Sequence, residues 1–210
     1  MTQLVYIADP MCSWCYGFTP QLERLLESLP DAELELVMGG LRAYEREPMD
    51  DARKAEVRDN WKRVHELSGQ PFGADATARA DFVYDTEPAC RAVVTMRSGA
   101  GPLAYAFFRA TQDAFYRDGR DVTRDDVLAD VAADIGVPRA AFAEAFASDE
   151  LKEITRQEFE MVQRWGINGF PALLLVHGDE LHLVASGYTD ADTLRERIEQ
   201  IRSAPPAAEH

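Results

Sequence analysis

Residues 4–18 have the sequence LVYIADPMCSWCYGF, in which a Cys-x-x-Cys motif follows a short apolar run. The run Leu4–Ala8 is rich in β-formers and is followed by Asp-Pro, which favours a buried strand over a helix of this length. Residues 13–29 carry apolar side chains every three or four positions and are closed by Pro30, which predicts a helix. The motif therefore lies where a predicted strand ends and a predicted helix begins.

This position gives the two cysteines different expected roles. At a helix N-terminus, unpaired amide hydrogens and the positive end of the helix dipole stabilise an anion, so the thiolate of Cys12 is favoured over its thiol. Cys15 lies one helical turn later, where it can attack a mixed disulfide formed by Cys12 and release the substrate. The sequence therefore predicts a redox-active dithiol in which Cys12 attacks and Cys15 resolves.

Strand-like runs occur near both ends of the chain and are separated by a long helical segment. Between residues 50 and 166 nearly every segment has helical spacing, and about six helices and no good strand are expected there. Thr189 is expected to cap a last helix that runs to about Arg202. Three further strands are expected at residues 34–38, 173–176 and 181–185.

The order of these elements predicts the fold. The ends of the chain provide strand, helix, strand and then strand, strand, helix, so the helical block is most simply an insertion into one small sheet domain. The expected class is α/β, a thioredoxin fold interrupted by a large all-helical insertion. The expected boundaries are residues 1–45 and 160–205 for the discontinuous thioredoxin-like domain, 46–159 for the helical insertion domain and 204–210 for a loose tail.

Pro171 is the second feature that supports this interpretation. Proline has no amide hydrogen and cannot continue a central strand, so its place just before the strand at 173–176 predicts a special turn. The preceding Gly169 gives the backbone freedom to enter a tight turn. We therefore expect the Phe170–Pro171 bond to be cis and to face the Cys12 sulfur.

Taken together, the motif residues resemble a known family. The stretch DPMCSWCYGF at 9–18, Pro20, the Phe-Pro171 turn and Gly187 after the final strand resemble the DsbA-type branch of the thioredoxin superfamily. More narrowly, the whole chain resembles the cytoplasmic FrnE-like predicted disulfide isomerases. The resemblance implies that Pro171 is cis and faces the dithiol, that the backbone of Phe170 pairs with an extended substrate, and that Cys12 is the exposed nucleophile.

The chain departs from this family pattern at two places. Many thioredoxin-like proteins have a buried acid six residues before the first cysteine, where this chain has Tyr6. Strongly oxidising DsbA proteins have a His between the cysteines, whereas Ser13 and Trp14 supply no cation. The expected activity is therefore that of a thiol-disulfide oxidoreductase or isomerase that reduces or shuffles protein or small-molecule disulfides. The dithiol itself is the redox group, no other cofactor is expected, and glutathione is a possible co-substrate.

Several residues near the motif have both a functional and an ordinary structural interpretation. Trp14, with Ser13, is expected to shape substrate access, although Trp14 also suits simple packing. Asp9 is a possible proton relay to Cys15, but an Asp before Pro is also ordinary turn chemistry. Cys90 lies among apolar residues in a predicted helix, so we expect burial as a small apolar side chain.

Three alternatives can be compared with a redox-active dithiol, and the last two of them remain open. A zinc half-site would need two ligands beyond Cys12 and Cys15, and the sequence has no second motif of that kind, so no metal is expected. The glutathione-dependent isomerases and kappa-class transferases share the inserted fold, although they generally have Ser at the position of Cys12. A non-catalytic adaptor that binds partner proteins is the third alternative.

Charge and composition exclude other classes. The 210 residues include 22 Lys and Arg against 37 Asp and Glu, for a net charge of −15. Nucleic-acid binding depends on basic residues that neutralise phosphates, so neither nucleic acid nor an anionic membrane surface is an expected partner. The apolar run at Leu4–Ala8 is too short for a secretory signal and has no basic residue before it, which predicts a cytoplasmic location. Sequence alone identifies no reducing partner.

Overall fold

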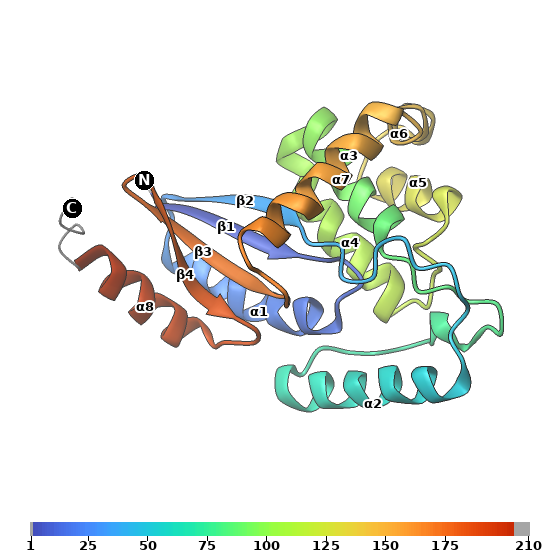
Figure 1. Cartoon of the computed structure of the whole chain (residues 1–210), viewed down its shortest axis with the longest axis horizontal. Coiled ribbons are helices and arrows are strands. Elements are labelled where there is room, and N and C mark those ends of the chain that lie inside the picture. Colours follow the sequence, from blue (N-terminus) through green and yellow to red (C-terminus); the bar gives the residue numbers. More distant parts are fainter. Residues whose placement is uncertain (1, 204–210) are drawn as a thin grey trace.

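A four-stranded mixed sheet forms the centre of the computed structural model, which describes residues 2–203 (Figure 1). β1 (Thr2–Ala8) pairs in parallel with β2 (Ala32–Met38) and antiparallel with β3 (Ala172–His177), while β4 (Glu180–Ser186) pairs antiparallel with β3. The strand order is β2-β1-β3-β4. All four predicted strands are present, each one or two residues longer at one or both ends than expected. The predicted tail at 204–210 lies outside the described residues.

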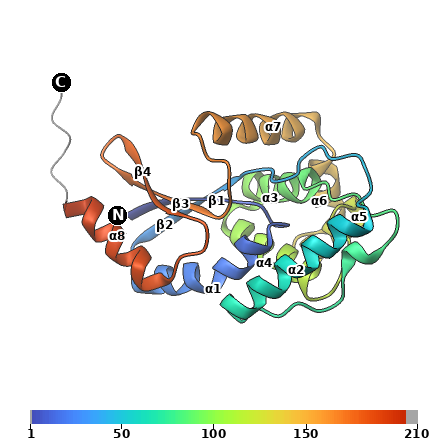
Figure 2. The ribbon, with the colours of Figure 1, turned by 60° about the horizontal axis from the view of Figure 1, so that its bottom comes forward.

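Helices cover both faces of this sheet. α1 (Ser13–Ser28) and α8 (Ala191–Ser203) lie against one face, and the end of α7 (Asp149–Arg164) lies against the other (Figure 2). Val5 and Ile7 of β1 pack on the α7 side, while the intervening side chains of β1 join the larger core on the α1 side. Because β1 is buried on both faces, its sequence is a continuous apolar run and does not alternate.

Six α-helices lie within residues 50–166, as predicted. Two short 3₁₀ turns occur at Ala76–Ala78 and Gly101–Leu103, and residues 50–166 of the described chain contain no strand. An isolated bridge joins Pro48 to Val83. The six helices are α2 (Asp51–Ser68), α3 (Glu87–Ala100), α4 (Ala104–Tyr116), α5 (Asp125–Asp134), α6 (Arg139–Phe146) and α7.

The start of α8 differs from the prediction. The helix begins at Ala191, and the backbone N–H of Thr193 donates to the carboxylate of Asp190 at 2.9 Å. The hydroxyl of Thr189 points back to the carbonyl of Gly187 at 3.5 Å. The predicted Thr189 cap is therefore wrong, because the carboxylate one residue later is the better-placed acceptor.

The sheet and the helical segment share one core. Tyr6 of β1 contacts Phe18 of α1 and Phe108 of α4, with ring centres 5.8 and 5.9 Å apart. α7 runs without a break through residue 159, and its Glu158 pairs with Arg97 of α3 at 2.7 Å. The Arg97 guanidinium also donates to the carbonyl of Leu36 in β2. The domain boundaries at residues 46 and 159 stay a prediction.

Candidate active site

Cys12 and Cys15 lie at the start of α1. Cys12 immediately precedes the first helical residue and has an extended backbone, with φ −87° and ψ 113°, and Cys15 is in the first turn. No side chain caps this end of the helix, and its first turn contains no acidic residue. The amide hydrogens and the positive end of the helix are therefore available to a negative charge on the Cys12 sulfur.

The two thiols differ in their environments. All three cysteines of the chain are free thiols in this structure. Cys15 is fully buried, and this burial raises the pKa of its thiol well above the usual value, with a further rise from the neighbouring Cys12. Cys15 is therefore a protonated thiol at neutral pH. Cys12 is 4% exposed, so it is less open to solvent than the expected exposed nucleophile, but it lines a cavity.

The turn before β3 lies against the Cys12 sulfur, although 158 residues separate the two in sequence. The Phe170–Pro171 bond is cis, as predicted. The Cys12 thiol donates a hydrogen bond to the carbonyl oxygen of Phe170, with 3.6 Å between sulfur and oxygen. The structure therefore brings Cys12, Phe170 and Pro171 together.

Gly39 makes room for this turn, which the sequence analysis did not foresee. A Cβ atom at Gly39 would lie 2.1 Å from the ring of Phe170, a distance that real Cβ atoms do not show. The Phe170 ring thus packs directly on the backbone just after β2. In the sequence, the Gly39-Gly40 pair is visible only as the end of a predicted strand.

Asn60 of α2 is a second residue that the sequence analysis missed. Its side-chain amide donates to the Ser13 hydroxyl at 2.7 Å, and its carbonyl oxygen accepts from the Trp14 indole N–H at 3.1 Å. The indole is only a donor, which fixes the orientation of the amide. The helical segment therefore holds both residues between the cysteines.

We expect Asn60→Ala to lower the free energy of unfolding by about 1–3 kcal/mol, because two hydrogen bonds are lost at about 0.5–1.5 kcal/mol each. Urea denaturation measures the change. Asn168→Ala is the matched control, since Asn168 is exposed and bonds only the carbonyl of Gly166. Equal stability of the two variants would contradict the role assigned to Asn60.

Asp9 is fully buried between two loops. Its carboxylate accepts backbone N–H groups from Met11 at 2.8 Å and from Leu41 at 2.7 Å. Burial raises the pKa of Asp9, and hydrogen bonds led by that from Thr86 offset part of this rise. The bond to Met11 is the turn chemistry expected of Asp before Pro. Asp9 also lies near Cys15: a hydrogen bond from its backbone lowers the pKa of the Cys15 thiol, and its charge raises that pKa by a smaller amount.

Cys90 and Tyr6 lie in the interior behind the dithiol. Cys90 of α3 is fully buried, as expected, and burial followed by the charge of Asp9 raises the pKa of its thiol well above the usual value. Burial also raises the pKa of Tyr6 well above its usual value, with nearby Cys15 adding to the rise. Tyr6 is therefore a neutral phenol at neutral pH and does not replace the buried acid of other thioredoxin-like proteins as a base.

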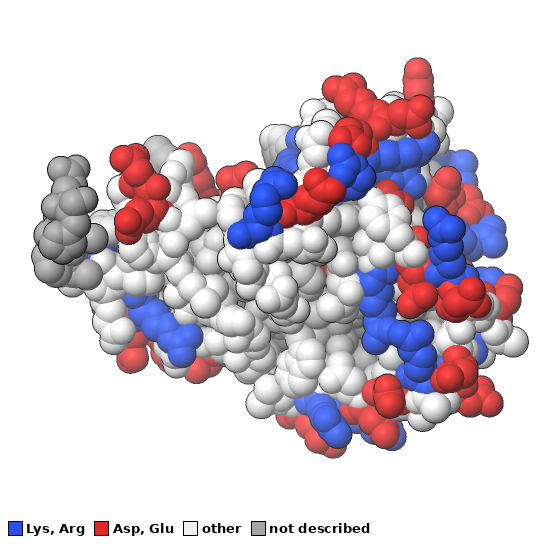
Figure 3. Space-filling view, viewed as in Figure 1, with Lys and Arg blue, Asp and Glu red and all other residues white. Residues whose placement is uncertain are grey.

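A cavity of about 370 Å³ lies in front of Cys12. The motif residues and the Gly169–Phe170 turn form one side, and α2 contributes Asn60 and Trp61. Leu41, Arg42, Glu56, Val57 and Tyr84 also line the cavity. Figure 3 shows acidic and basic side chains interspersed over the helical part of one face, with no large area of a single sign. The charged residues that line the cavity are Arg42 and Glu56.

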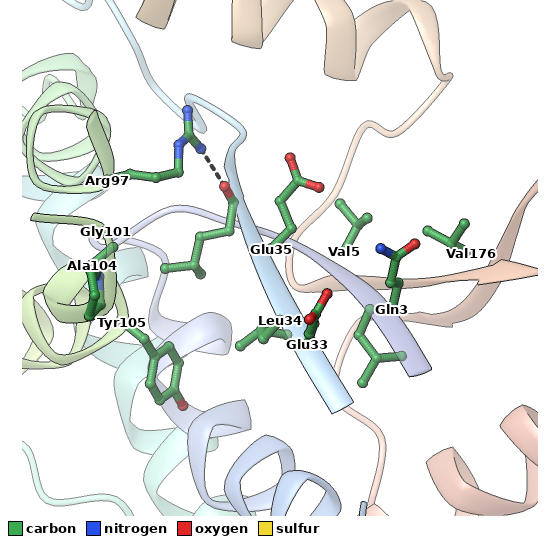
Figure 4. Close-up of a pocket in the computed structure, with 13 residues that line it drawn as sticks. Gln3, Val5, Glu33, Leu34, Glu35, Arg97, Gly101, Ala104, Tyr105 and Val176 are labelled. Atoms are coloured by element: carbon green, nitrogen blue, oxygen red, sulfur yellow. Dashed lines mark hydrogen bonds between the residues drawn. The ribbon is translucent and has the colours of Figure 1, made fainter. Parts of the chain in front are cut away.

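A larger cavity, of about 510 Å³, lies elsewhere (Figure 4). It is lined by the outer strand β2, including Glu33 and Glu35, and by Arg97 and Tyr105 of α3 and α4. It contains no cysteine, and its only cation, Arg97, is already paired with Glu158. The cavity at Cys12 is therefore the better candidate for a reaction site.

Within residues 2–203, no group of three or more His, Cys, Asp or Glu side chains is arranged to hold a metal ion. No helix in the same part of the chain has the length and apolar character needed to cross a membrane.

A thioredoxin-type sheet with a Cys-x-x-Cys pair at the start of α1 and a cis-proline beside it defines the class of thioredoxin-fold dithiol proteins. Residues 3–199 match the DSBA-like thioredoxin domain. The chain belongs to this family of thiol-disulfide oxidoreductases. No curated protein matches the sequence.

Solved structures with similar folds agree with this assignment. A putative protein disulfide isomerase from Nitrosomonas europaea is 37% identical, covers 95% of this chain and 96% of its own, and has a TM-score of 0.85. The cytosolic disulfide reductase DsbM from Pseudomonas aeruginosa is 28% identical over 96% of this chain and all of its own, with a TM-score of 0.76. A structure of DsbM with GSH is also similar, at 27% identity, 95% and 99% coverage and a TM-score of 0.75.

Proposed function

We propose that the protein reduces or shuffles disulfides through Cys12 and Cys15. The Cys12 thiolate attacks one sulfur of the substrate, which forms a mixed disulfide and expels the first substrate thiolate. Cys15 then loses its proton and attacks the Cys12 sulfur, which releases the second substrate thiol and leaves a Cys12–Cys15 disulfide. Two electrons thus pass from the dithiol to the substrate. An external thiol, oxidised to its disulfide, restores the dithiol.

The observation that carries this proposal is the asymmetry of the two thiols. Cys12 sits at the uncapped N-terminus of α1, where a thiolate is stabilised, and it borders the cavity. Cys15 lies behind it, fully buried and with a raised pKa. Such a pair supports attack from Cys12 and later resolution from Cys15.

The neighbouring residues have proposed roles in binding substrate. Ser13 and Trp14, held by Asn60, shape the entrance to the cavity, and the backbone beside Phe170 and Pro171 offers hydrogen bonds to an extended substrate. Asp9 is the proposed acceptor for the proton that Cys15 loses, since it is the buried carboxylate near that thiol and its raised pKa suits proton uptake.

The co-substrate and compartment are further proposals. Glutathione is the proposed small thiol, supported by the similarity to the DsbM structure with GSH. The similarity to a cytosolic reductase supports a cytoplasmic location. Glutathione in that compartment would maintain the dithiol form, which favours reduction and isomerisation over net oxidation. The partners are then protein or small-molecule disulfides.

Catalysed disulfide reduction separates this function from the alternatives. The protein should accelerate the reduction of insulin or of a small disulfide by dithiothreitol above the rate without protein, and the double variant Cys12→Ser with Cys15→Ser should not. A non-catalytic adaptor would give no acceleration. A transferase-type enzyme would conjugate or isomerise a substrate without oxidation of the dithiol. Either result would contradict the proposed reaction.

Cys90→Ala is expected to retain full turnover, because the exchange needs two thiols and Cys90 is fully buried in α3. The lost packing should cost about 1 kcal/mol of stability. Steady-state reduction rates and urea denaturation measure both effects. A loss of activity as large as that of Cys12→Ser would instead make Cys90 a member of the reaction cycle.

A further inference from the structure

We infer that Arg42 binds a carboxylate of the substrate and that the preferred substrates are disulfides of small, carboxylate-bearing thiols. The inference rests on the proposed function, since Arg42 matters for turnover only if Cys12 attacks disulfides. It adds a specificity-determining residue and a substrate class. Neither is visible in the Cys-x-x-Cys motif.

Arg42 shares the cavity with the nucleophile. It lies in the loop between β2 and α2, and it lines the same 370 Å³ space as Cys12 and Tyr84. The guanidinium carbon is 5.1 Å from the centre of the Tyr84 ring, a cation–π contact. The Tyr84 hydroxyl in turn donates to the carbonyl of Met11 at 2.6 Å. A chain of contacts thus links the guanidinium to the residue next to Cys12.

The backbone of Arg42 is fixed as well. Its N–H donates to the hydroxyl of Thr86 at 3.1 Å, and its carbonyl accepts from the N–H of Thr86 at 3.4 Å. Thr86 directly precedes α3, so this loop is anchored to the helical segment. A guanidinium held from both its backbone and its ring contact loses little freedom when a ligand binds.

The positive charge of Arg42 is free for a ligand. Among residues 2–203, no carboxylate forms an ion pair with this guanidinium, whereas most other arginines of the chain are paired. Glu56 lines the cavity but does not pair with Arg42. Arginine binds carboxylates through two parallel hydrogen bonds. The net charge of −15 repels anions from the protein as a whole. The positive charge of Arg42 attracts an anion locally, at the cavity.

The cavity also limits the size of the substrate. A volume of about 370 Å³ falls within the range of about 300–1,000 Å³ that is typical of small-molecule sites. Cys12 is only 4% exposed, so a disulfide must enter this space to reach the sulfur. A small disulfide can do so. A disulfide within a folded protein cannot enter as easily, because the chain around it meets α2 and the Phe170 turn.

The test is single-turnover oxidation of the pre-reduced protein by two disulfides of different charge. Glutathione disulfide carries carboxylates, and hydroxyethyl disulfide is neutral. Acid quenching and thiol counting give the second-order rate constant without an external reductant. Arg42→Gln should lower the rate constant for glutathione disulfide about tenfold, which corresponds to about 1.4 kcal/mol. Its rate with hydroxyethyl disulfide should stay within about twofold of the unsubstituted protein.

Two further variants test whether the effect depends on the position and on the paired donors of Arg42. Arg46→Gln removes the same charge from an exposed residue outside the cavity and should leave both rate constants unchanged. Arg42→Lys keeps the charge without the paired donors and should have an intermediate effect. An unchanged rate with hydroxyethyl disulfide shows that a variant is folded and that its dithiol reacts.

The outcomes separate this inference from the proposed function. If Arg42→Gln lowers both rate constants equally or neither of them, or if Arg46→Gln causes the same selective loss, Arg42 is not a carboxylate receptor, while disulfide exchange by Cys12 still stands. Faster oxidation of the unsubstituted protein by insulin than by glutathione disulfide would overturn the small-substrate class. If the protein reacts with no disulfide, the proposed function fails and this inference fails with it.

Discussion

Cys12→Ser is expected to reduce disulfides no faster than a solution without protein. The Ser hydroxyl is a far weaker nucleophile than a thiolate, and Cys15 cannot take over because it is fully buried and its pKa is raised well above the usual value. Steady-state reduction of a small disulfide, with the uncatalysed rate subtracted, measures the loss.

Cys15→Ser separates the first step of the reaction from the second. It should also lose sustained turnover, but it should still complete the first half of the reaction and release one equivalent of substrate thiol. Cys90→Ala serves as the control for removing a buried thiol. Appreciable turnover by Cys12→Ser would mean that another group attacks the substrate.

Arg91→Met is expected to lower the free energy of unfolding by about 3–5 kcal/mol, because it leaves a buried carboxylate without its partner. Arg91 and Glu87 are both almost completely buried in α3 and pair at 2.7 Å. The guanidinium also donates to the carbonyl of Phe146 and lies 3.7 Å from the centre of that ring. This group therefore links α3 to the end of α6. Urea denaturation measures the change.

The double variant Arg91→Met with Glu87→Gln separates the charge effect from lost packing. Removing both charges should recover much of the lost stability. Arg156→Met is the surface control, since Arg156 pairs with Glu153 and Glu160 on an exposed face, and it should change stability little. A small effect of Arg91→Met alone would show that the pair does not stabilise the helical segment.

The predictable part of this protein lies in local patterns. The run Leu4–Ala8 and the apolar spacing of the helices predict the elements, because burial of one face imposes a period on the sequence. The same patterns place Cys12 and Cys15 at a strand–helix junction, as the structure has them, and the redox chemistry expected there stays a prediction. Pro171 before β3 predicts the cis bond for a similar local reason.

The residues that complete the site were not predictable in this way. Asn60 contacts Ser13 and Trp14 across 47 and 46 residues of sequence, and no local pattern distinguishes it from the other polar residues of α2. Arg42 lies in a loop, where exposed cations are ordinary, and its contacts with Tyr84 and Thr86 place it at the cavity that Cys12 lines. Gly39 resembles a simple strand end until the Phe170 ring is seen to pack on it. Each depends on tertiary contacts between distant segments.

The claim that Cys12 attacks and Cys15 resolves is tested most directly by mapping the mixed disulfide that Cys15→Ser forms with glutathione disulfide. Intact mass and peptide mass give the number of adducts and the residue that carries them. The expected result is one glutathione adduct, on Cys12, and no comparable adduct on Cys15 in Cys12→Ser. An adduct on Cys90, or preferential modification of Cys15 when Cys12 is removed, would contradict the assignment.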